Sequence, residues 1–328
     1  MRTITLEEHF ATPGFLKGPG SGIIERAARQ GGRLARIAAQ LQDVDELRIV
    51  EMDAAGIEMQ VLSLSSPGVE QCVAAEAVEL AREANEFVAA AMKRHPKRFG
   101  GFATLPTADP PRAAEELERV VGQYGFQGAL INGHHRGRYL DDPIFWPILE
   151  RAVALRVPIY LHPTEPPETV LAASYAGFSP EVAYMFATAG WGWHIETGVH
   201  VLRMILGGVF DRFPELEIII GHMGEALPFM LQRADIMTPE ITGLQRPISA
   251  YLRGNVHYTF SGFNFTPTFL DLLLEVGVDR IMFSADYPYA SMTQARAFLD
   301  RLPVSDADRE RIAHGNAEQL MKFPGRDR

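Results

Sequence analysis

The sequence predicts an α/β protein whose 328 residues form a single parallel (β/α)8 TIM-type barrel. Short runs rich in Ile, Val, Leu and Phe alternate with longer segments of helical spacing, which is typical of strands joined by crossover helices. Eight such runs occur, and the length fits, since barrels of this kind commonly take about 250 residues or more as one domain. Because the active site of such a barrel lies at the C-terminal ends of its strands, residues at those ends are the first candidates for function.

The apolar runs place the expected strands in order along the chain. They lie near residues 3–8, 59–65, 99–106, 128–132, 157–162, 216–221, 256–261 and 280–285. Between them, Asp43 and Asp109 stand where helix N-caps are expected, and Gly207, Gly208 and Gly277 fall near expected helix ends. No sequence repeat beyond this alternation divides the chain, so we expect one domain over residues 1–328.

Two irregular segments are expected to form lid loops over the barrel mouth. About thirty residues separate the fifth strand, at Leu161, from the next helix near His194, against a usual loop of about 2–6 residues. This excess predicts one lid near residues 164–193, and the stretch of six glycines and two prolines over residues 12–32 predicts a second. The first lid carries the aromatic residues Phe178, Tyr184, Phe186, Trp191 and Trp193. They either form an aromatic wall over the mouth or pack the loop onto the barrel.

The composition excludes several classes of function. With 47% hydrophobic and 22% charged residues, the chain resembles an average folded, soluble protein. Its 41 acidic and 31 basic residues give a net charge of -10, and no basic cluster suits nucleic acid or an anionic membrane. The single cysteine, Cys72, fits a reducing compartment, and no apolar run is long enough to span a bilayer. We therefore expect a cytoplasmic protein.

Residues that commonly bind metal ions end four of the expected strands. Glu7 and His9 close the first strand, and their spacing places both side chains on one face. The fifth, sixth and eighth strands end in His162, His222 and Asp286. A single histidine after a strand is more often a hydrogen-bonded loop residue than a ligand, but the whole set is hard to explain by chance. Carboxylates and imidazoles converging on one barrel mouth suit a divalent ion of the zinc or manganese type.

No other site type is indicated by the sequence. There is no Gly-x-Ser-x-Gly elbow, no Walker phosphate loop and no Gly-x-Gly-x-x-Gly fingerprint after a strand, so a nucleotide cofactor is not expected. His194 and His200 are six residues apart on an expected helix, which puts them on different faces and excludes a helical ligand pair. The histidines for which we expect no site role are His95, His134, His135, His257 and His314.

These strand-end residues resemble the amidohydrolase superfamily, with Glu7 in place of the usual first histidine. Within it, the chain is similar to the metal-dependent, non-oxidative aromatic-acid decarboxylases, which include the gamma-resorcylate, 5-carboxyvanillate and aminocarboxymuconate-semialdehyde decarboxylases. The similarity covers nearly the whole chain. The segments that carry it are Leu6-Glu7-Glu8-His9-Phe10, Met52-Asp53-Ala54-Ala55-Gly56-Ile57, Tyr160-Leu161-His162-Pro163, Gly221-His222-Met223-Gly224-Glu225 and Asp286-Tyr287-Pro288.

The resemblance implies a set of site residues and partners. One Zn²⁺ or Mn²⁺ would be bound by four ligands, namely Glu7, His9, His162 and Asp286. His222 and Glu225 would form a dyad beside it, and Asp286 would also act in catalysis. Arg48 and Arg233 resemble arginines that the family uses for the substrate carboxylate or for subunit contacts. The expected partner is a small aromatic carboxylate, and the expected assembly is a homodimer or homotetramer.

Three functions stay open at this point. In a decarboxylase, Asp286 would protonate the ring carbon that carries the carboxylate, and CO₂ would leave. In a hydrolase, the same metal ion would activate water against a lactone, ester or amide, and Asp286 would take the proton. A barrel without activity would be a binding protein. The residues alone permit both the decarboxylase and the hydrolase.

Overall fold

The computed structural model describes residues 1–323 and contains eight parallel strands in the order β1 to β8. The strands are β1 (Ile4–Phe10), β2 (Met59–Leu64), β3 (Phe99–Thr104), β4 (Gly128–Asn132), β5 (Ile159–His162), β6 (Ile218–Ile220), β7 (Val256–Thr259) and β8 (Ile281–Met282). Each lies within a few residues of its expected place, so the predicted (β/α)8 barrel is confirmed. All residues in these strands are buried, as expected of parallel strands covered by helices.

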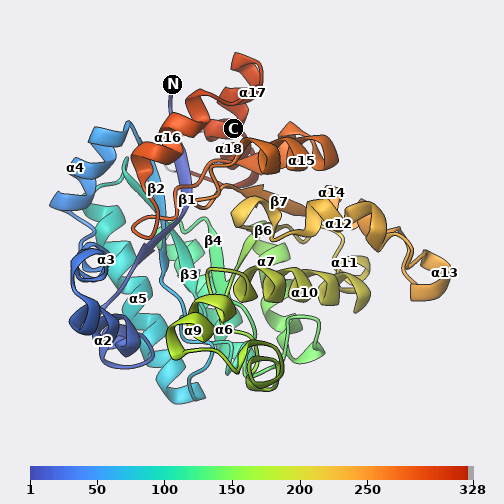
Figure 1. Ribbon diagram of the computed structural model, residues 1–328, viewed down its shortest axis with the longest axis horizontal. Helices are drawn as coiled ribbons and strands as arrows, with labels where there is room; N and C mark the ends of the chain where they lie inside the picture. Colours follow the sequence, from blue (N-terminus) through green and yellow to red (C-terminus); the bar gives the residue numbers. More distant parts are fainter. Residues whose placement is uncertain (324–328) are drawn as a thin grey trace.

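The first and last strands close the barrel. Leu6 forms a parallel bridge with Ser284, and the backbone N–H of His9 donates to the carbonyl of Tyr287 at 2.7 Å. In Figure 1, the blue strand β1 accordingly lies next to the red C-terminal segments. This closure brings residues from the two ends of the chain to the same rim.

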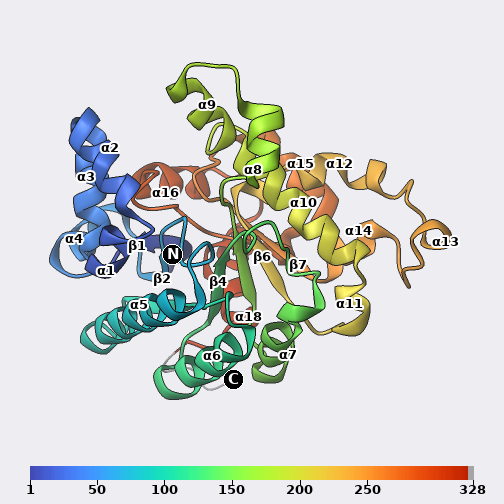
Figure 2. The same cartoon turned by 90° about the horizontal axis from the view of Figure 1, so that it is seen from below.

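The helices surround the barrel on its outer side (Figures 1 and 2). They are α1 (Pro13–Lys17), α2 (Ser21–Gln30), α3 (Gly32–Gln42), α4 (Glu46–Ala55), α5 (Ala74–Arg94), α6 (Pro110–Tyr124), α7 (Trp146–Leu155), α8 (Glu168–Val170), α9 (Pro180–Ala187), α10 (Gly192–Leu206), α11 (Val209–Arg212), α12 (Leu227–Ala234), α13 (Pro239–Thr242), α14 (Ile248–Gly254), α15 (Thr266–Val276), α16 (Met292–Asp300), α17 (Asp306–Glu310) and α18 (Asn316–Leu320). Short 3₁₀ turns occur at Pro143–Phe145, His222–Gly224 and Val278–Arg280, and π-helical turns at Leu171–Tyr175 and Arg311–Gly315.

Most of the expected helix signals are found at helix ends. Asp109 caps α6 by accepting the backbone N–H of Arg112, and Gly277 follows α15 with a φ of 81°. The N-cap expected at Asp43 lies two residues later, because Asp45 is the residue that precedes α4. Asp43 instead ends α3, and its carboxylate accepts the backbone N–H groups of Asp45 and Arg48.

One end of the barrel interior is closed by apolar side chains. Inward-facing residues such as Leu6, Val61 and Phe102 form a buried cluster, which Met321 and Phe323 join from the C-terminal segment. The opposite end holds buried polar side chains, among them Glu7 and His9. The open cavity therefore lies at the C-terminal ends of the strands, as the fold class predicts.

Both expected lid segments border this cavity but are not plain loops. Residues 12–32 contain α1 and α2, and residues 164–193 contain α8, a π-helical turn and α9, which projects from the barrel in Figure 2. Two of the five aromatic residues take the first expected role, and the other three lie outside the cavity and are at least partly exposed. Tyr184 and Trp193 line the cavity, whereas Phe178 and Phe186 contact each other edge to face and Trp191 is 52% exposed.

Within residues 1–323, no helix has both the length and the apolar character needed to cross a bilayer.

Two glycines give a matched test of the packing between strands. A Cβ at Gly128, at the start of β4, would lie 2.3 Å from the backbone oxygen of Pro158, so Gly128→Ala should lower the free energy of unfolding by about 1–3 kcal/mol or more. Gly122, in α6, has open space at this position, so Gly122→Ala should raise that free energy by about 0.5–1 kcal/mol. Urea unfolding curves measure both, and equal stability of the two variants would contradict the packing described here.

Candidate metal centre

Left-handed backbone conformations bring the functional side chains to the barrel mouth. Glu7 and Asp286 each have a φ of 63°, and His222 and Glu225 have φ values of 48° and 54°. Non-glycine residues adopt this conformation rarely, and such residues concentrate at functional sites. At Glu7 the conformation accompanies a register shift between β1 and β2, as in a β-bulge.

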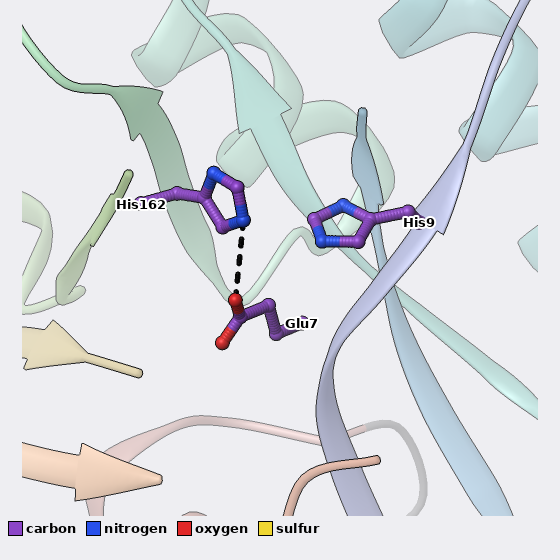
Figure 3. Close-up of side chains that lie close together, drawn as sticks. All are labelled: Glu7, His9 and His162. Atoms are coloured by element: carbon purple, nitrogen blue, oxygen red, sulfur yellow. Dashed lines mark ion pairs between the residues drawn. The ribbon is translucent and has the colours of Figure 1, made fainter. Parts of the chain in front are cut away.

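The predicted metal ligands lie together at this mouth. Glu7 Oε1 is 3.2 Å from His162 Nε2, and His9 Nε2 is 3.3 Å from Asp286 Oδ1. The ligand atoms of Glu7, His9 and His162 all lie within 4.8 Å of one another, and Figure 3 shows the three side chains converging. Two ligands bonded to one ion at about 2.1 Å lie about 3.0–3.4 Å apart. The separations of 3.2 Å and 3.3 Å match that spacing.

Neighbouring groups leave ligand atoms free to bind an ion. Glu7 Oε2 accepts hydrogen bonds from Tyr160 and Ser261, while the buried Glu7 Oε1 has no hydrogen-bond partner. The Nδ1 of His162 donates to the carbonyl of Pro163 at 2.9 Å, which leaves the Nε2 lone pair available. The residues therefore fit a divalent cation.

The charge states follow from burial and from neighbouring charges. Burial opposes ionisation of Glu7, but electrostatic attraction to the imidazoles of His222 and His162 outweighs it and lowers the Glu7 pKa. Burial, together with repulsion from His162, lowers the pKa of His9 and keeps its imidazole neutral, as a ligand must be. Burial and the charge of Glu7 raise the pKa of Asp286 well above its ordinary range. A cation between Glu7 and Asp286 would relieve this repulsion.

Beside the metal ligands, two imidazoles contact one carboxylate. His222 Nδ1 lies 2.7 Å from Glu225 Oε1, and His194 Nδ1 lies 2.6 Å from Glu225 Oε2. Burial alone would lower the pKa of His222, but Glu225 and Glu7 outweigh it and raise this pKa to about 10. His222 Nε2 lies 3.8 Å from Glu7 Oε1, so the dyad adjoins the metal ligands.

The cavity above these residues has a volume of about 1330 Å³. His9, His162, His222 and Asp286 line its base. The aromatic residues that line it are Tyr184, Trp193, Phe263 and Tyr289. A floor of polar and metal-ligating groups beneath aromatic walls is suited to a small aromatic molecule that carries polar substituents.

The two arginines singled out in the sequence do not line this cavity. Arg48 is fully buried, and its guanidinium donates to the carbonyls of His9 at 2.5 Å and Asp43 at 2.9 Å. It also lies 4.6 Å from the centre of the Tyr287 ring. Arg48 therefore holds the backbone beneath the site and does not contact the cavity. Arg233 is exposed on α12.

The structure revises the assessment of two other histidines. His194 does not pair with His200, as expected, but it contacts Glu225 across 31 residues of sequence, a contact that helical spacing cannot reveal. His134 also lines the cavity, where its Nε2 lies 3.1 Å from the carbonyl oxygen of Glu165. His95 pairs with Asp45 at 2.7 Å near the surface, as expected of a residue outside the site.

The chain belongs to the amidohydrolase family, whose model matches residues 32–323. A gamma-resorcylate decarboxylase from Polaromonas sp. is 39% identical over 332 aligned positions, which cover 98% of each chain. The dihydroxybenzoic acid decarboxylase structure from Polaromonas sp., with bound manganese and the inhibitor 2-nitroresorcinol, has a TM-score of 0.88 at 38% identity and covers 97% of this chain and 96% of its own. The 5-carboxyvanillate decarboxylase from Sphingomonas paucimobilis has a TM-score of 0.90 at 33% identity, with 98% and 99% coverage. The resemblance inferred from the strand-end motifs is confirmed.

The metal centre predicts a selective loss of metal. Protein expressed with Mn²⁺ should carry about one divalent ion per chain. His162→Ala should lower that content by about tenfold or more, because loss of a residue that merely supports a ligand already lowers metal affinity by about 10–100-fold. The control is His95→Ala, which also removes an imidazole paired with a carboxylate. Because this pair lies outside the cavity, the variant protein should keep its metal. Elemental analysis by mass spectrometry measures both, and an equal loss in the two variants would mean that the site lies elsewhere.

Proposed function

We propose that the protein is a non-oxidative decarboxylase that removes the carboxylate of a hydroxylated benzoate. The observation that carries the proposal is the ligand set of Glu7, His9, His162 and Asp286 at the base of a cavity with aromatic walls. Full-length relatives named gamma-resorcylate decarboxylase and dihydroxybenzoic acid decarboxylase support this class of substrate. The manganese in the latter structure favours Mn²⁺ over Zn²⁺ as the ion.

The chemistry requires a proton donor facing the ring. Direct loss of CO₂ would leave the bonding electron pair on the ring as an aryl carbanion, so protonation of that carbon must come first. Asp286 lines the cavity, and its contact with His9 involves only Oδ1, which leaves Oδ2 to carry the proton. An electron pair of the phenolate ring accepts this proton at the carbon that carries the carboxylate. The electrons of the carbon–carbon bond then return to the ring as CO₂ leaves.

The remaining groups hold the substrate. When bound, the divalent ion would supply a Lewis acid that stabilises negative charge on the substrate oxygens. His222, fixed by Glu225, is placed to hydrogen-bond a ring hydroxyl from the side of Glu7. Residues from the segments 12–32 and 164–193 line the cavity, where they would limit the access of water to the ring and so favour proton transfer over exchange with solvent.

A hydrolase would use the same residues differently. Water, and not a ring carbon, would exchange a proton with Asp286, and a lactone, ester or amide would be cleaved. The full-length decarboxylase relatives favour the first assignment.

We also propose assembly into a homodimer or homotetramer through the face that contains α12. Arg233 lies there beside Phe229 and Met230, which are 79% and 47% exposed. Exposed apolar side chains around an arginine are common in subunit interfaces. In such an assembly Arg233 would reach the substrate carboxylate in the cavity of the neighbouring subunit.

Deuterium incorporation separates decarboxylation from hydrolysis. In D₂O, the Mn²⁺-loaded protein should release CO₂ from a hydroxybenzoate and place one deuterium where the carboxylate was. A lactone or ester should give no acid. Mass spectrometry and proton NMR of the product measure the label, and cleavage of an ester or lactone without CO₂ release from any hydroxybenzoate would overturn the proposal.

The role of Asp286 has its own test. Asp286→Asn keeps an oxygen that can bind the ion but carries no acidic proton, so kcat should fall by about 10²–10⁴-fold while part of the metal is retained. Asp142→Asn changes a carboxylate that pairs with Arg138 outside the cavity, and its activity should be normal. A rate near that of the unchanged protein in Asp286→Asn would assign the proton to another group, with His222 the next candidate.

Arg233 tests the assembly. Loss of a charged hydrogen bond worth about 1.5–3 kcal/mol predicts that Arg233→Ala raises KM by about 10–100-fold. Arg301, exposed after α16, gives the control, and Arg301→Ala should leave KM unchanged. A fully active protein that light scattering shows to be monomeric would refute a site shared between subunits.

A further inference from the structure

We infer that His194 is a positioning residue that fixes the carboxylate of Glu225 and, through it, the ring of His222. The inference rests on the proposed function, because it concerns the orientation of His222 toward the substrate. Its basis is the pair of hydrogen bonds on Glu225, one for each oxygen, which join residues from α10 and from the segment after β6.

The Glu225 carboxylate has little freedom in this arrangement. Its side chain is fully buried, with Oε1 at 2.7 Å from His222 Nδ1 and Oε2 at 2.6 Å from His194 Nδ1. Burial alone would raise the pKa of Glu225, but the charges of His222 and His194 outweigh it and lower this pKa. Two donors, one on each oxygen, fix the plane of the carboxylate. Loss of one donor would leave a buried anionic oxygen unpaired and would let the carboxylate group rotate.

The ring of His194 is itself held on several sides. Its Nε2 lies 3.2 Å from the carbonyl oxygen of Ala189, in the turn that precedes α10. Its ring meets those of Phe263 and His222 edge to face, at centroid distances of 5.1 Å and 4.7 Å. The turn is tight, since a Cβ on Gly192 would lie 2.2 Å from the carbonyl oxygen of Ala187. The end of the lid segment thus fixes where His194 meets Glu225.

A second metal ion is the other use for three such side chains, since His194, His222 and Glu225 form a potential ligand cluster. The distances argue against it. Ligands that share an ion lie about 3.0–3.4 Å apart, whereas the contacts of 2.6 Å and 2.7 Å are those of hydrogen bonds between an imidazole and a carboxylate. The cluster therefore orients a proton-bearing ring and does not bind metal.

Two substitutions at His194 separate the hydrogen bond from the packing. His194→Phe keeps a ring against Phe263 but removes the donor, and His194→Asn keeps an amide N–H near the position of Nδ1. The matched control is His95→Phe, which removes an imidazole paired with Asp45 outside the cavity. Each variant is assayed with a hydroxybenzoate for kcat, KM and metal content.

We expect kcat of His194→Phe to fall by about 10–100-fold, in the range known for residues that support a ligand. Metal content should stay within about twofold, because His194 is not one of the expected metal ligands. The fall in kcat should exceed any rise in KM, because His194 lines the cavity but acts through Glu225. His194→Asn should recover most of the lost rate, and His95→Phe should behave as the unchanged protein. Full kcat in His194→Phe, or no recovery in His194→Asn, would overturn the inference, as would a loss of metal in His194→Phe that assigns His194 as a ligand.

Crystal structures of the unchanged protein and of His194→Phe separate this inference from the proposed function. If the unchanged protein releases no CO₂ from hydroxybenzoates, the proposed function fails, but the structures still test the positioning. A Glu225 carboxylate that turns and lengthens its contact with His222 in the variant supports it. An unmoved Glu225 with the 2.7 Å contact to His222 intact contradicts it.

Discussion

Two carboxylates, Glu7 and Asp286, are buried in the same barrel mouth, and their mutual repulsion is the constraint on which the rest of the site depends. Burial and the charge of Glu7 raise the cost of ionising Asp286, and positive charge nearby is needed to stabilise both as anions. A divalent ion bound by both, with His9 and His162 as its other ligands, would supply that charge. The same ion would give the buried Glu7 Oε1, which has no hydrogen-bond partner, an interaction of its own.

Strand β1 meets this constraint by giving adjacent glutamates different surroundings. Glu7, which has a left-handed backbone conformation, lies 3.2 Å from His162. Glu8 instead accepts the backbone N–H groups of Ala285 and Tyr287 and so ties β1 to the segment after β8. Burial raises the pKa of Glu8 to about 8, against the opposing hydrogen bond from Ala285. Arg48 donates to the His9 carbonyl from below, so the ends of the chain and the ligand-bearing strand are fixed together before any ion binds.

Much of the fold and of the metal centre could be predicted because both follow local patterns. Apolar runs of strand length predicted the eight strands, and the parallel barrel brings strand ends to one rim. His9 and Asp286 therefore lie 3.3 Å apart although 277 positions separate them in the numbering. The contacts that were not predicted depend on turns and on tertiary packing. His194 reaches Glu225 through the turn before α10, and Arg48 is held beneath the site by backbone carbonyls, which carry no signal in the sequence.

Anomalous X-ray diffraction from crystals of Mn²⁺-loaded protein tests most directly whether one divalent ion binds Glu7, His9, His162 and Asp286. Data collected on both sides of the manganese absorption edge should show one peak per chain, at about 2.0–2.3 Å from ligand atoms of all four residues. Glu225 and His194 should lie outside bonding distance of that peak. A peak between His194, His222 and Glu225, or no peak at full manganese saturation, would contradict the claim.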